Sequence, residues 1–263
     1  MNLMDKNLYL VGGVVRDEIL GVESFDTDYC YEGNAIEFAQ GLNIIKTNPD
    51  FGTVRVKIMD EEIDIASTRI ETYPKAGHLP IITAIGCSLK EDLIRRDFTI
   101  NAMAKNTLTN EIFDYYNGKE DIKNKKLRVL HNNSFIDDPT RIIRGLKFAV
   151  RFGFTLENDT KILQDKYLEN INYDMSFHRL KKELKETFNL KNNAAYEIFV
   201  EQNIYKLLGE NQPSKGFLLK NIPLNNNVKE PWLNYLAPFN LENISLSKAE
   251  QNELMSYRSC RNL

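Results

Sequence analysis

Two acidic residues near the start of the chain, Asp26 and Asp28, have the spacing of a cation-binding pair. Alternate residues of a β-strand project from the same face, so a strand over Phe25–Cys30 would place both carboxylates together and turn Thr27 away. Paired carboxylates are suitable ligands for hard divalent cations such as Mg²⁺. The sequence therefore predicts a cation site at Asp26 and Asp28.

Two glycines, Gly12 and Gly13, precede this acidic pair. We expect a strand over Tyr9–Val11 and a helix from Val14 onward, with the glycines as the turn between them. Glycine lets backbone amides approach a ligand closely, and a helix N-terminus favours negative charge. A glycine turn or an acidic pair alone would be an ordinary surface feature. In this order, they favour a site for a metal-bound triphosphate.

The elements around these residues are predicted from periodicity and turn residues. The first half of the chain alternates short β-like runs with helical stretches, and the pattern from about Thr140 onward is helical. We expect a hairpin of Thr53–Ile58 and Glu62–Ala66, a loop over Tyr73–Pro80, a capping box at Ser88–Glu91 that opens a helix carrying Arg95 and Arg96, and a loop or domain border over Asn211–Asn227.

The composition is that of a folded protein without a membrane segment. The chain has 263 residues, of which 42% are hydrophobic, and no apolar run approaches membrane-spanning length. Three scattered cysteines, Cys30, Cys87 and Cys260, favour neither a disulfide framework nor a zinc site, so we expect a cytoplasmic protein. The formal net charge of −3 means that any RNA contact would depend on local basic clusters.

Four blocks of sequence, in order, resemble the class II tRNA nucleotidyltransferases and bacterial poly(A) polymerases. The resemblance extends from about Leu8 to the neighbourhood of Leu208. The blocks are Leu10–Gly21 followed by Asp26-Thr27-Asp28; Arg95–Ala102; Asp114 with Gly118, Asp121 and Arg128; and Asp137–Arg144.

The resemblance implies an α+β fold: a nucleotidyltransferase-type head with a mixed β-sheet, followed by an all-helical neck and a shortened body. The head would cover residues 1–130, the neck with a base-reading helix 131–208, and a partial helical body 209–263, with the family's tail absent. The chain also departs from the family at three positions: His178 replaces a usual glutamate, Asp137 stands where glutamate is usual, and Lys147 replaces an arginine that can contact nucleotide.

The resemblance also implies roles around the triphosphate. Arg16 would act with Gly13 against the phosphates, as a guanidinium offers a fork of donors to phosphate oxygens. Arg96 and Asp97 would lie on the phosphate and ribose side of the nucleotide, and Asn101 would brace that turn.

Nucleotidyl transfer needs an activated hydroxyl and a neutralised pyrophosphate leaving group, which two Mg²⁺ ions can supply. Asp26 and Asp28 are the expected catalytic metal ligands, and Asp64 in the apolar run Ile63–Ile65 is the candidate third carboxylate. An equally good interpretation places Asp64 on the open face of an edge strand, because spacing alone does not decide between them.

A third group of residues would read the base. Asp138 followed by Pro139 is a good helix start, and Arg141, Arg144 and Lys147 would form a basic stripe on that helix. By resemblance, Asp138 and Arg141 read the base edge: a carboxylate accepts from the exocyclic amino group of cytosine or adenine, and an arginine donates to the neighbouring ring nitrogen. Uracil and guanine would leave buried polar groups unpaired.

The sequence thus predicts an RNA nucleotidyltransferase that adds C and A, or A alone, to the 3′ end of tRNA without a nucleic-acid template, using ATP and CTP. Three alternatives remain: a CC-adding or poly(A)-adding relative with the same signatures, an inactive RNA-binding module that keeps the fold, and an enzyme that transfers nucleotides to a small molecule. The sequence leaves the oligomeric state undefined.

Overall fold

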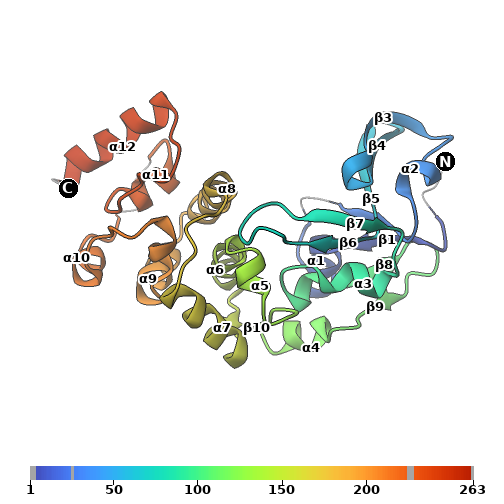
Figure 1. Cartoon of the computed structure of the whole chain (residues 1–263), viewed down its shortest axis with the longest axis horizontal. Coiled ribbons are helices and arrows are strands. Elements are labelled where there is room, and N and C mark those ends of the chain that lie inside the picture. Colours follow the sequence, from blue (N-terminus) through green and yellow to red (C-terminus); the bar gives the residue numbers. More distant parts are fainter. Residues whose placement is uncertain (1–3, 25–26, 224–227, 262–263) are drawn as a thin grey trace. The chain divides into compact units, whose positions relative to one another are not determined.

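The computed structural model describes residues 4–24, 27–223 and 228–261, and it has the predicted α+β fold (Figure 1). The chain divides into two compact units, one of Met1–Pro74 with Pro80–His131 and the other of Lys75–Leu79 with Asn132–Leu263. The first unit contains a mixed β-sheet, which the sequence predicted for the head. The division of the remaining chain into neck and body stays a prediction.

The main sheet of the first unit has seven strands in the order β3-β4-β5-β2-β1-β8-β9. Strands β2 and β5 run parallel, whereas the other neighbouring strands of this sheet are antiparallel among the residues described. The strands are β1 Leu8–Val11, β2 Tyr29–Tyr31, β3 Asn43–Asn48, β4 Thr53–Ile58, β5 Glu61–Ser67, β8 Ala104–Asn106 and β9 Ile112–Phe113.

Helices cover both faces of this sheet. On one face, Leu8 and Ile65 pack against Ala35 and Ala39 at helix α2. On the other, Tyr9 and Val11 pack with residues of α3, as expected for alternating strand side chains. The helices of this unit are α1 Gly13–Leu20, α2 Ala35–Phe38, α3 Leu89–Ile94 and α4 Gly118–Lys123, with 3₁₀ turns Pro49–Phe51 and Thr99–Asn101; the remaining strands are the hairpin β6 Arg69–Thr72 and β7 Ile81–Ile85, and β10 Lys126–Leu127.

Most local predictions for the first unit are confirmed. Strands β4 and β5 form the predicted hairpin, although β5 begins one residue earlier, since Ile58 pairs with Glu61. Tyr73–Pro80 is a loop, and Ser88 with Glu91 forms the predicted capping box of α3. The expectation that this helix carries Arg95 and Arg96 is wrong. It ends at Ile94, because the chain must become extended for Phe98 to enter the core.

The predicted strand Phe25–Cys30 is only partly correct. Strand β2 covers Tyr29–Tyr31, and Asp28 precedes it, although the Asp28 carbonyl still accepts a hydrogen bond from the Val11 amide at 3.0 Å. Phe25 and Asp26 lie outside the described residues.

The second unit is helical, as the sequence predicted. Its core contains an aromatic cluster in which Phe188 stacks on Tyr235 and meets Phe199 edge to face, each with ring centroids 5.3 Å apart. Its elements are α5 Ser134–Asp137, α6 Thr140–Phe152, β11 Thr155–Leu156, α7 Asn158–Glu169, α8 Phe177–Phe188, α9 Asn193–Glu201, a 3₁₀ turn Ile204–Leu208, α10 Lys215–Lys220, α11 Pro231–Leu236 and α12 Lys248–Arg261.

Helix α10 lies within Asn211–Asn227, so that segment is not a continuous loop; residues 224–227 are outside the described part. Among residues 4–24, 27–223 and 228–261, no helix combines the length and the apolarity needed to cross a bilayer.

A glycine contact provides a test of packing in the first unit. A Cβ added to Gly118 would lie 2.4 Å from the Thr99 carbonyl oxygen. We expect Gly118→Ala to destabilise the protein by about 1–3 kcal/mol, because backbone must move to relieve the overlap. Gly216→Ala is the matched control: nothing lies within 4 Å of its added Cβ. Urea unfolding of both variants measures the difference, and equal stabilities would contradict the predicted overlap.

Candidate active site

The turn between β1 and α1 has the geometry of an anion site. Gly12 is the N-cap residue of α1 with φ of 74°, which glycine adopts without strain, and no side chain caps this helix. Gly13 is already the first helical residue. An uncapped helix N-terminus favours negative charge, so the predicted glycine turn forms and is suited to phosphate.

The Arg96 guanidinium lies against this turn. A Cβ on Gly12 would be 3.1 Å from Arg96 Nη1, so the missing side chain makes room for the arginine. Arg96 Nη2 donates to Asp92 Oδ2 at 3.2 Å. Arg96 Nε is buried and has no hydrogen-bond partner among the residues described. This guanidinium therefore has donor capacity left beside the helix start.

Arg16 is buried, with 4% of its surface exposed. It donates to Asn101 Oδ1 at 2.6 Å and to Asp17 Oδ1 at 2.8 Å. Asn101 in turn donates to Asp97 Oδ1 at 2.9 Å, and that oxygen also accepts from the Phe98 amide. The chain of contacts fixes the segment after Arg96. Direct contact of Arg16 or Asp97 with nucleotide stays a prediction.

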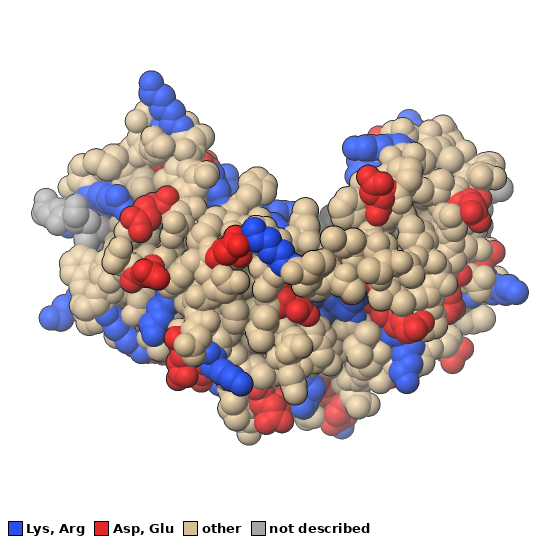
Figure 2. Space-filling view, viewed as in Figure 1, with Lys and Arg blue, Asp and Glu red and all other residues tan. Residues whose placement is uncertain are grey.

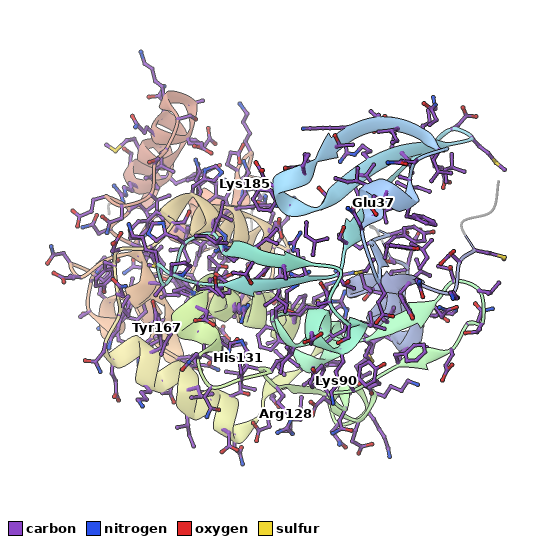
Figure 3. All side chains as sticks on the ribbon, turned by 45° about the vertical axis from the view of Figure 1, so that its right-hand side comes forward. Glu37, Lys90, Arg128, His131, Tyr167 and Lys185 are labelled. Atoms are coloured by element: carbon purple, nitrogen blue, oxygen red, sulfur yellow. The ribbon has the colours of Figure 1, made fainter. Side chains whose placement is uncertain are left out.

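Two acidic residues of the linker after this segment stabilise the local fold around α4. Asp114 accepts hydrogen bonds from the amides of Gly118 and Lys119 at 2.7 and 2.9 Å. Asp121 accepts from Thr99 Oγ1 at 2.7 Å and pairs with Arg128 at 3.1 Å. The Arg128 side chain is labelled in Figure 3. The acidic members of this block therefore have structural partners.

Asp28, directly before β2, and Asp64, within β5, occupy equivalent positions in the register of two parallel strands. Tyr29 of β2 pairs with Ile65 of β5, and each carboxylate belongs to the residue just before. Asp28 is exposed and its partner in the predicted pair, Asp26, lies outside the described residues. The sheet thus brings Asp64 next to Asp28, as the third-carboxylate hypothesis requires.

Asp64 is also bound by a basic residue. Arg55, opposite it on β4, donates from Nε and Nη2 to the two carboxylate oxygens at 2.8 and 2.7 Å. These hydrogen bonds hold the pKa of Asp64 below its ordinary value. Both Asp64 oxygens therefore accept from Arg55, and a bound cation would compete with this guanidinium.

A cavity of about 450 Å³ joins these groups. Asp28 and Asp64 line it together with four basic residues: Lys46, Arg55, Arg69 and Arg96. This mixture suits a polyphosphate carrying a divalent cation, as carboxylates bind the cation and guanidinium groups bind phosphate oxygens. Within the described ranges, no cluster of three or more His, Cys, Asp or Glu side chains could hold a metal ion.

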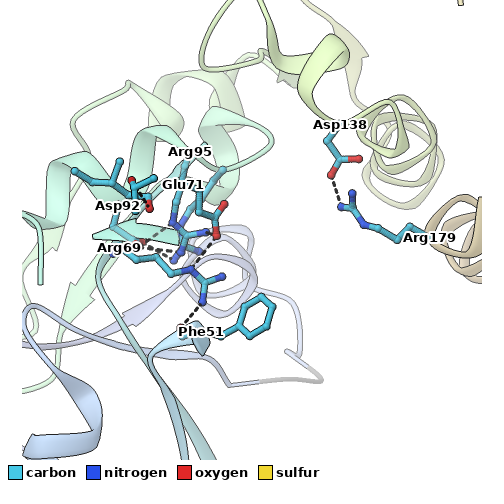
Figure 4. Close-up of polar contacts among 10 residues, drawn as sticks. Phe51, Arg69, Glu71, Asp92, Arg95, Asp138 and Arg179 are labelled. Carbon is cyan, nitrogen blue, oxygen red and sulfur yellow. Dashed lines mark hydrogen bonds and ion pairs between the residues drawn. The ribbon is translucent and has the colours of Figure 1, made fainter. Parts of the chain in front are cut away.

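Behind the cavity lies a buried network of charges (Figure 4). Arg69 donates to Glu71 Oε1 at 2.8 Å and to the Phe51 carbonyl at 2.9 Å, and Arg95 reaches the same Glu71 oxygen at 2.9 Å. Arg95 also binds Asp92, which is fully buried. The Arg69–Glu71 ion pair is largely buried, because the Glu71 side chain is only 4% exposed.

In the second unit, Asp138 is held on both oxygens. Oδ1 accepts from the Thr140 amide and hydroxyl at 3.1 and 2.6 Å, and Oδ2 accepts from Arg179 of α8 (Figure 4). Arg179 also donates to the His78 carbonyl at 3.4 Å. Asp138 is thus an ordered, 5% exposed carboxylate at the start of α6.

The loop Lys75–Leu79 belongs to this unit through backbone hydrogen bonds. The Gly77 amide donates to the Asp137 carbonyl, and the Gly77 carbonyl accepts from the Ser176 amide, each at 3.0 Å. A Cβ on Gly77 would lie 2.6 Å from the Met175 Cβ. Through Gly77, these two hydrogen bonds connect Asp137, the residue before Asp138, with Ser176 at the start of the helix that carries Arg179.

The predicted basic stripe of α6 is not an open surface. Arg141 is 3% exposed and donates to Ser134 Oγ at 2.7 Å. Arg144 and Lys147 pair with Glu183 of α8 at 3.2 and 2.9 Å. The helical spacing was correct, but α6 packs against α8, whose acidic residue neutralises that face. Whether Asp138, Arg141 and Arg144 bind nucleotide stays a prediction.

Sequence reasoning missed three contacts of the candidate site: Asp92 with its arginines, Arg55 with Asp64, and Arg179 with Asp138. Two of these contacts could have been predicted from the sequence. Asp92 precedes Arg95 and Arg96 by three and four residues, a helical ion-pair spacing. The hairpin register places Arg55 opposite Asp64. The third joins separate helices and had no local signal.

Charge on the visible surface is mixed. Figure 2 shows Lys and Arg side chains interspersed with Asp and Glu over both units on the face drawn. This distribution agrees with the net charge of −3 and gives no single broad basic field on that face.

Comparison with known proteins identifies the family. The family model described as "Poly A polymerase head domain" matches residues 8–128. An A-adding tRNA nucleotidyltransferase of Aquifex aeolicus is 48% identical over 164 residues, covering 59% of this chain and 20% of the relative. One of Halalkalibacterium halodurans is 38% identical over 197 residues, covering 69% of this chain and 46% of the relative.

A solved structure of a tRNA nucleotidyltransferase with a primer tRNA and an incoming ATP analogue has a TM-score of 0.74 and 31% identity. It covers 97% of this chain and 80% of that chain. The chain therefore belongs to the tRNA nucleotidyltransferase and poly(A) polymerase family. It spans less than half of the length of the two curated relatives described above.

The buried network predicts a pH dependence of stability. Burial would raise the pKa of Asp92, but the adjacent Arg96 and Arg95 guanidinium groups hold it below its ordinary value. A carboxylate with a lowered folded-state pKa stabilises the protein above its unfolded pKa of about 4, and this contribution is lost as pH falls towards the folded value. We therefore expect Asp92→Asn to be less stable than wild type at pH 7. The difference between the two proteins in the free energy of unfolding, measured with urea, should narrow below about pH 4. A difference that stays constant over this range would contradict the prediction that Asp92 is ionised in the folded protein.

Proposed function

We propose that this chain is an RNA nucleotidyltransferase that adds nucleotides to the 3′ end of tRNA without a nucleic-acid template. The observation that carries the proposal is the cavity in which Asp28 and Asp64 face Arg55, Arg69 and Arg96. Nucleotidyl transfer uses cation-binding oxygens and phosphate-binding guanidinium groups, and the start of α1, which no side chain caps, favours the phosphates as well. The names of the A-adding relatives support tRNA as the acceptor.

Mg²⁺ fits the donor set, because carboxylate oxygens are the ligands it prefers. Asp26 and Asp28 would hold it, with Asp64 as the third candidate. When bound, the ions lower the pKa of the attacking 3′ hydroxyl and neutralise charge on the leaving pyrophosphate. Arg96 and the amide end of α1 bind the triphosphate, assisted by Gly12 and Gly13, which keep side chains out of the way.

In the second unit, Asp138 and Arg141 would select the base, with Arg144 next to them on α6. Asp138 accepts a hydrogen bond from the exocyclic amino group of adenine or cytosine, and Arg141 donates to the ring nitrogen beside it. A base with a carbonyl group at that position would leave both groups unpaired. The substrates are ATP alone for A addition, or CTP and ATP for CCA addition.

The test is incubation with Mg²⁺, radiolabelled ATP or CTP, and tRNA transcripts that lack the whole CCA end, its last two nucleotides or only the final adenosine. Labelled AMP on the last transcript alone would identify an A-adding enzyme. Labelled CMP followed by AMP on the first would identify CCA addition. Absence of label with all three transcripts would refute the proposal.

Removing one acidic side chain should abolish transfer without unfolding the protein. We expect Asp28→Ala to lower the rate of AMP incorporation by roughly 10²–10³-fold or more, because a cation ligand is lost. Asp28 is exposed, so the thermal midpoint should change little. Asp60→Ala, an exposed acid in the β4–β5 turn, is the matched control and should keep wild-type activity. Full activity of Asp28→Ala would exclude it as a metal ligand.

Base selection is tested separately. Arg141→Ala should lower the preference for ATP and CTP over UTP and GTP by about tenfold or more in kcat/KM. Arg151→Ala, an exposed change on the same helix, should leave the preference unchanged. An unaltered preference in Arg141→Ala would refute its base-reading role.

A further inference from the structure

Asp92 is a fully buried carboxylate behind the candidate triphosphate site. Its two oxygens have different partners. Oδ1 accepts from the Arg69 amide at 3.1 Å and from Arg95 Nε and Nη2 at 3.0 and 2.9 Å. Oδ2 accepts from Arg96 Nη2 at 3.2 Å. Oδ1 thus joins α3 to the β6 strand, and Oδ2 holds Arg96.

The Arg96 guanidinium is placed by two neighbours on different sides. Asp92 binds Nη2, and the absent side chain of Gly12 leaves room for Nη1, which would be 3.1 Å from a Cβ there. The same residue lines the cavity with Asp28 and Asp64. The residue follows the end of α3, so the helix alone does not fix its side chain.

We propose that Asp92 is a positioning residue, which holds the Arg96 guanidinium against Gly12 so that its remaining donors face the triphosphate of the incoming nucleotide. The inference rests on the proposed function and assigns a role to a residue that does not itself touch substrate. Asp92 acts through one oxygen on Arg96 and through the other on the two elements that support it.

If Asp92 acted only through its charge, loss of this carboxylate would change the affinity for ATP in the opposite direction from that expected for a positioning role. Asp92→Asn removes a negative charge near bound phosphates, so by charge alone ATP would bind more tightly. An unanchored Arg96 must instead be ordered when ATP binds, which weakens binding. The direction of the change therefore separates a positioning role from a general electrostatic one.

The matched control is Glu71→Gln. Glu71 is a second buried acid of the same network and binds Arg69 and Arg95 (Figure 4), whereas Arg96 binds Asp92. Loss of Glu71 tests the consequences of disturbing the buried charges without releasing Arg96. A general structural defect would affect both variants alike.

The experiment is isothermal titration of ATP with Mg²⁺ into the full chain, for wild type, Asp92→Asn, Arg96→Ala, the double variant and Glu71→Gln. We expect Asp92→Asn to raise the ATP Kd about tenfold, and the double variant to be no weaker than Arg96→Ala alone within about twofold. Glu71→Gln should stay within about threefold of wild type. An ATP Kd that is unchanged or lower in Asp92→Asn, or multiplicative effects in the double variant, would overturn the inference.

Arg96→Lys provides a test in which Asp92 is intact and folding is less at risk. Lysine keeps the charge but has one terminal nitrogen, which cannot bind Asp92 and the phosphates as the guanidinium fork does. We expect weaker ATP binding and no further weakening when Asp92→Asn is added; wild-type binding by Arg96→Lys would overturn the inference. Wild type that binds ATP but labels no tRNA would refute the proposed function alone, whereas wild type that does not bind ATP would refute both.

Discussion

The parallel pairing of β2 with β5 is the constraint on which the candidate site depends. In a sheet whose other described neighbours are antiparallel, this pairing sets Asp28 beside Asp64, although 36 positions separate them in the chain. Parallel neighbours carry side chains at equal heights on the same face. A shift of one residue would send one carboxylate to the opposite face, where Ile65 packs against α2. The core residues around Ile65 therefore fix the register, and through it the spacing of the acids.

Buried charge is the second determinant of the site. Asp92 and Glu71 are removed from water, which is costly unless each ion is fully paired. Arg69, Arg95 and Arg96 supply these partners from two adjacent elements, and two of the three also line the cavity. Through Asp92, the interior network thus sets the direction of Arg96, which lines the candidate site. These contacts hold Arg95 and Arg96, which the sequence led us to expect on a longer helix after Ser88.

Much of this arrangement was predictable from the sequence, because the relevant signals are local. Glycines at the end of an apolar run predicted the turn at Gly12, and the capping box predicted the start of α3. Alternation of apolar residues predicted the hairpin. The remaining features depend on tertiary contacts: α3 ends early to admit Phe98 to the core, and Arg144 is paired because α8 supplies Glu183. Helical spacing alone could not reveal which face another helix would cover.

Few residue types other than glycine are compatible with position 12 of this turn. Any larger amino acid there would meet two independent penalties, one from the backbone angle of 74° and one from the guanidinium 3.1 Å away. A second substitution that moved Arg96 away would still leave the φ angle at position 12 unfavourable. A change that relaxed the φ angle would still leave the added side chain too close to Arg96. A single substitution at position 12 is therefore disfavoured, and a tolerated replacement would need both a different backbone conformation and a small shift of the Arg96 guanidinium.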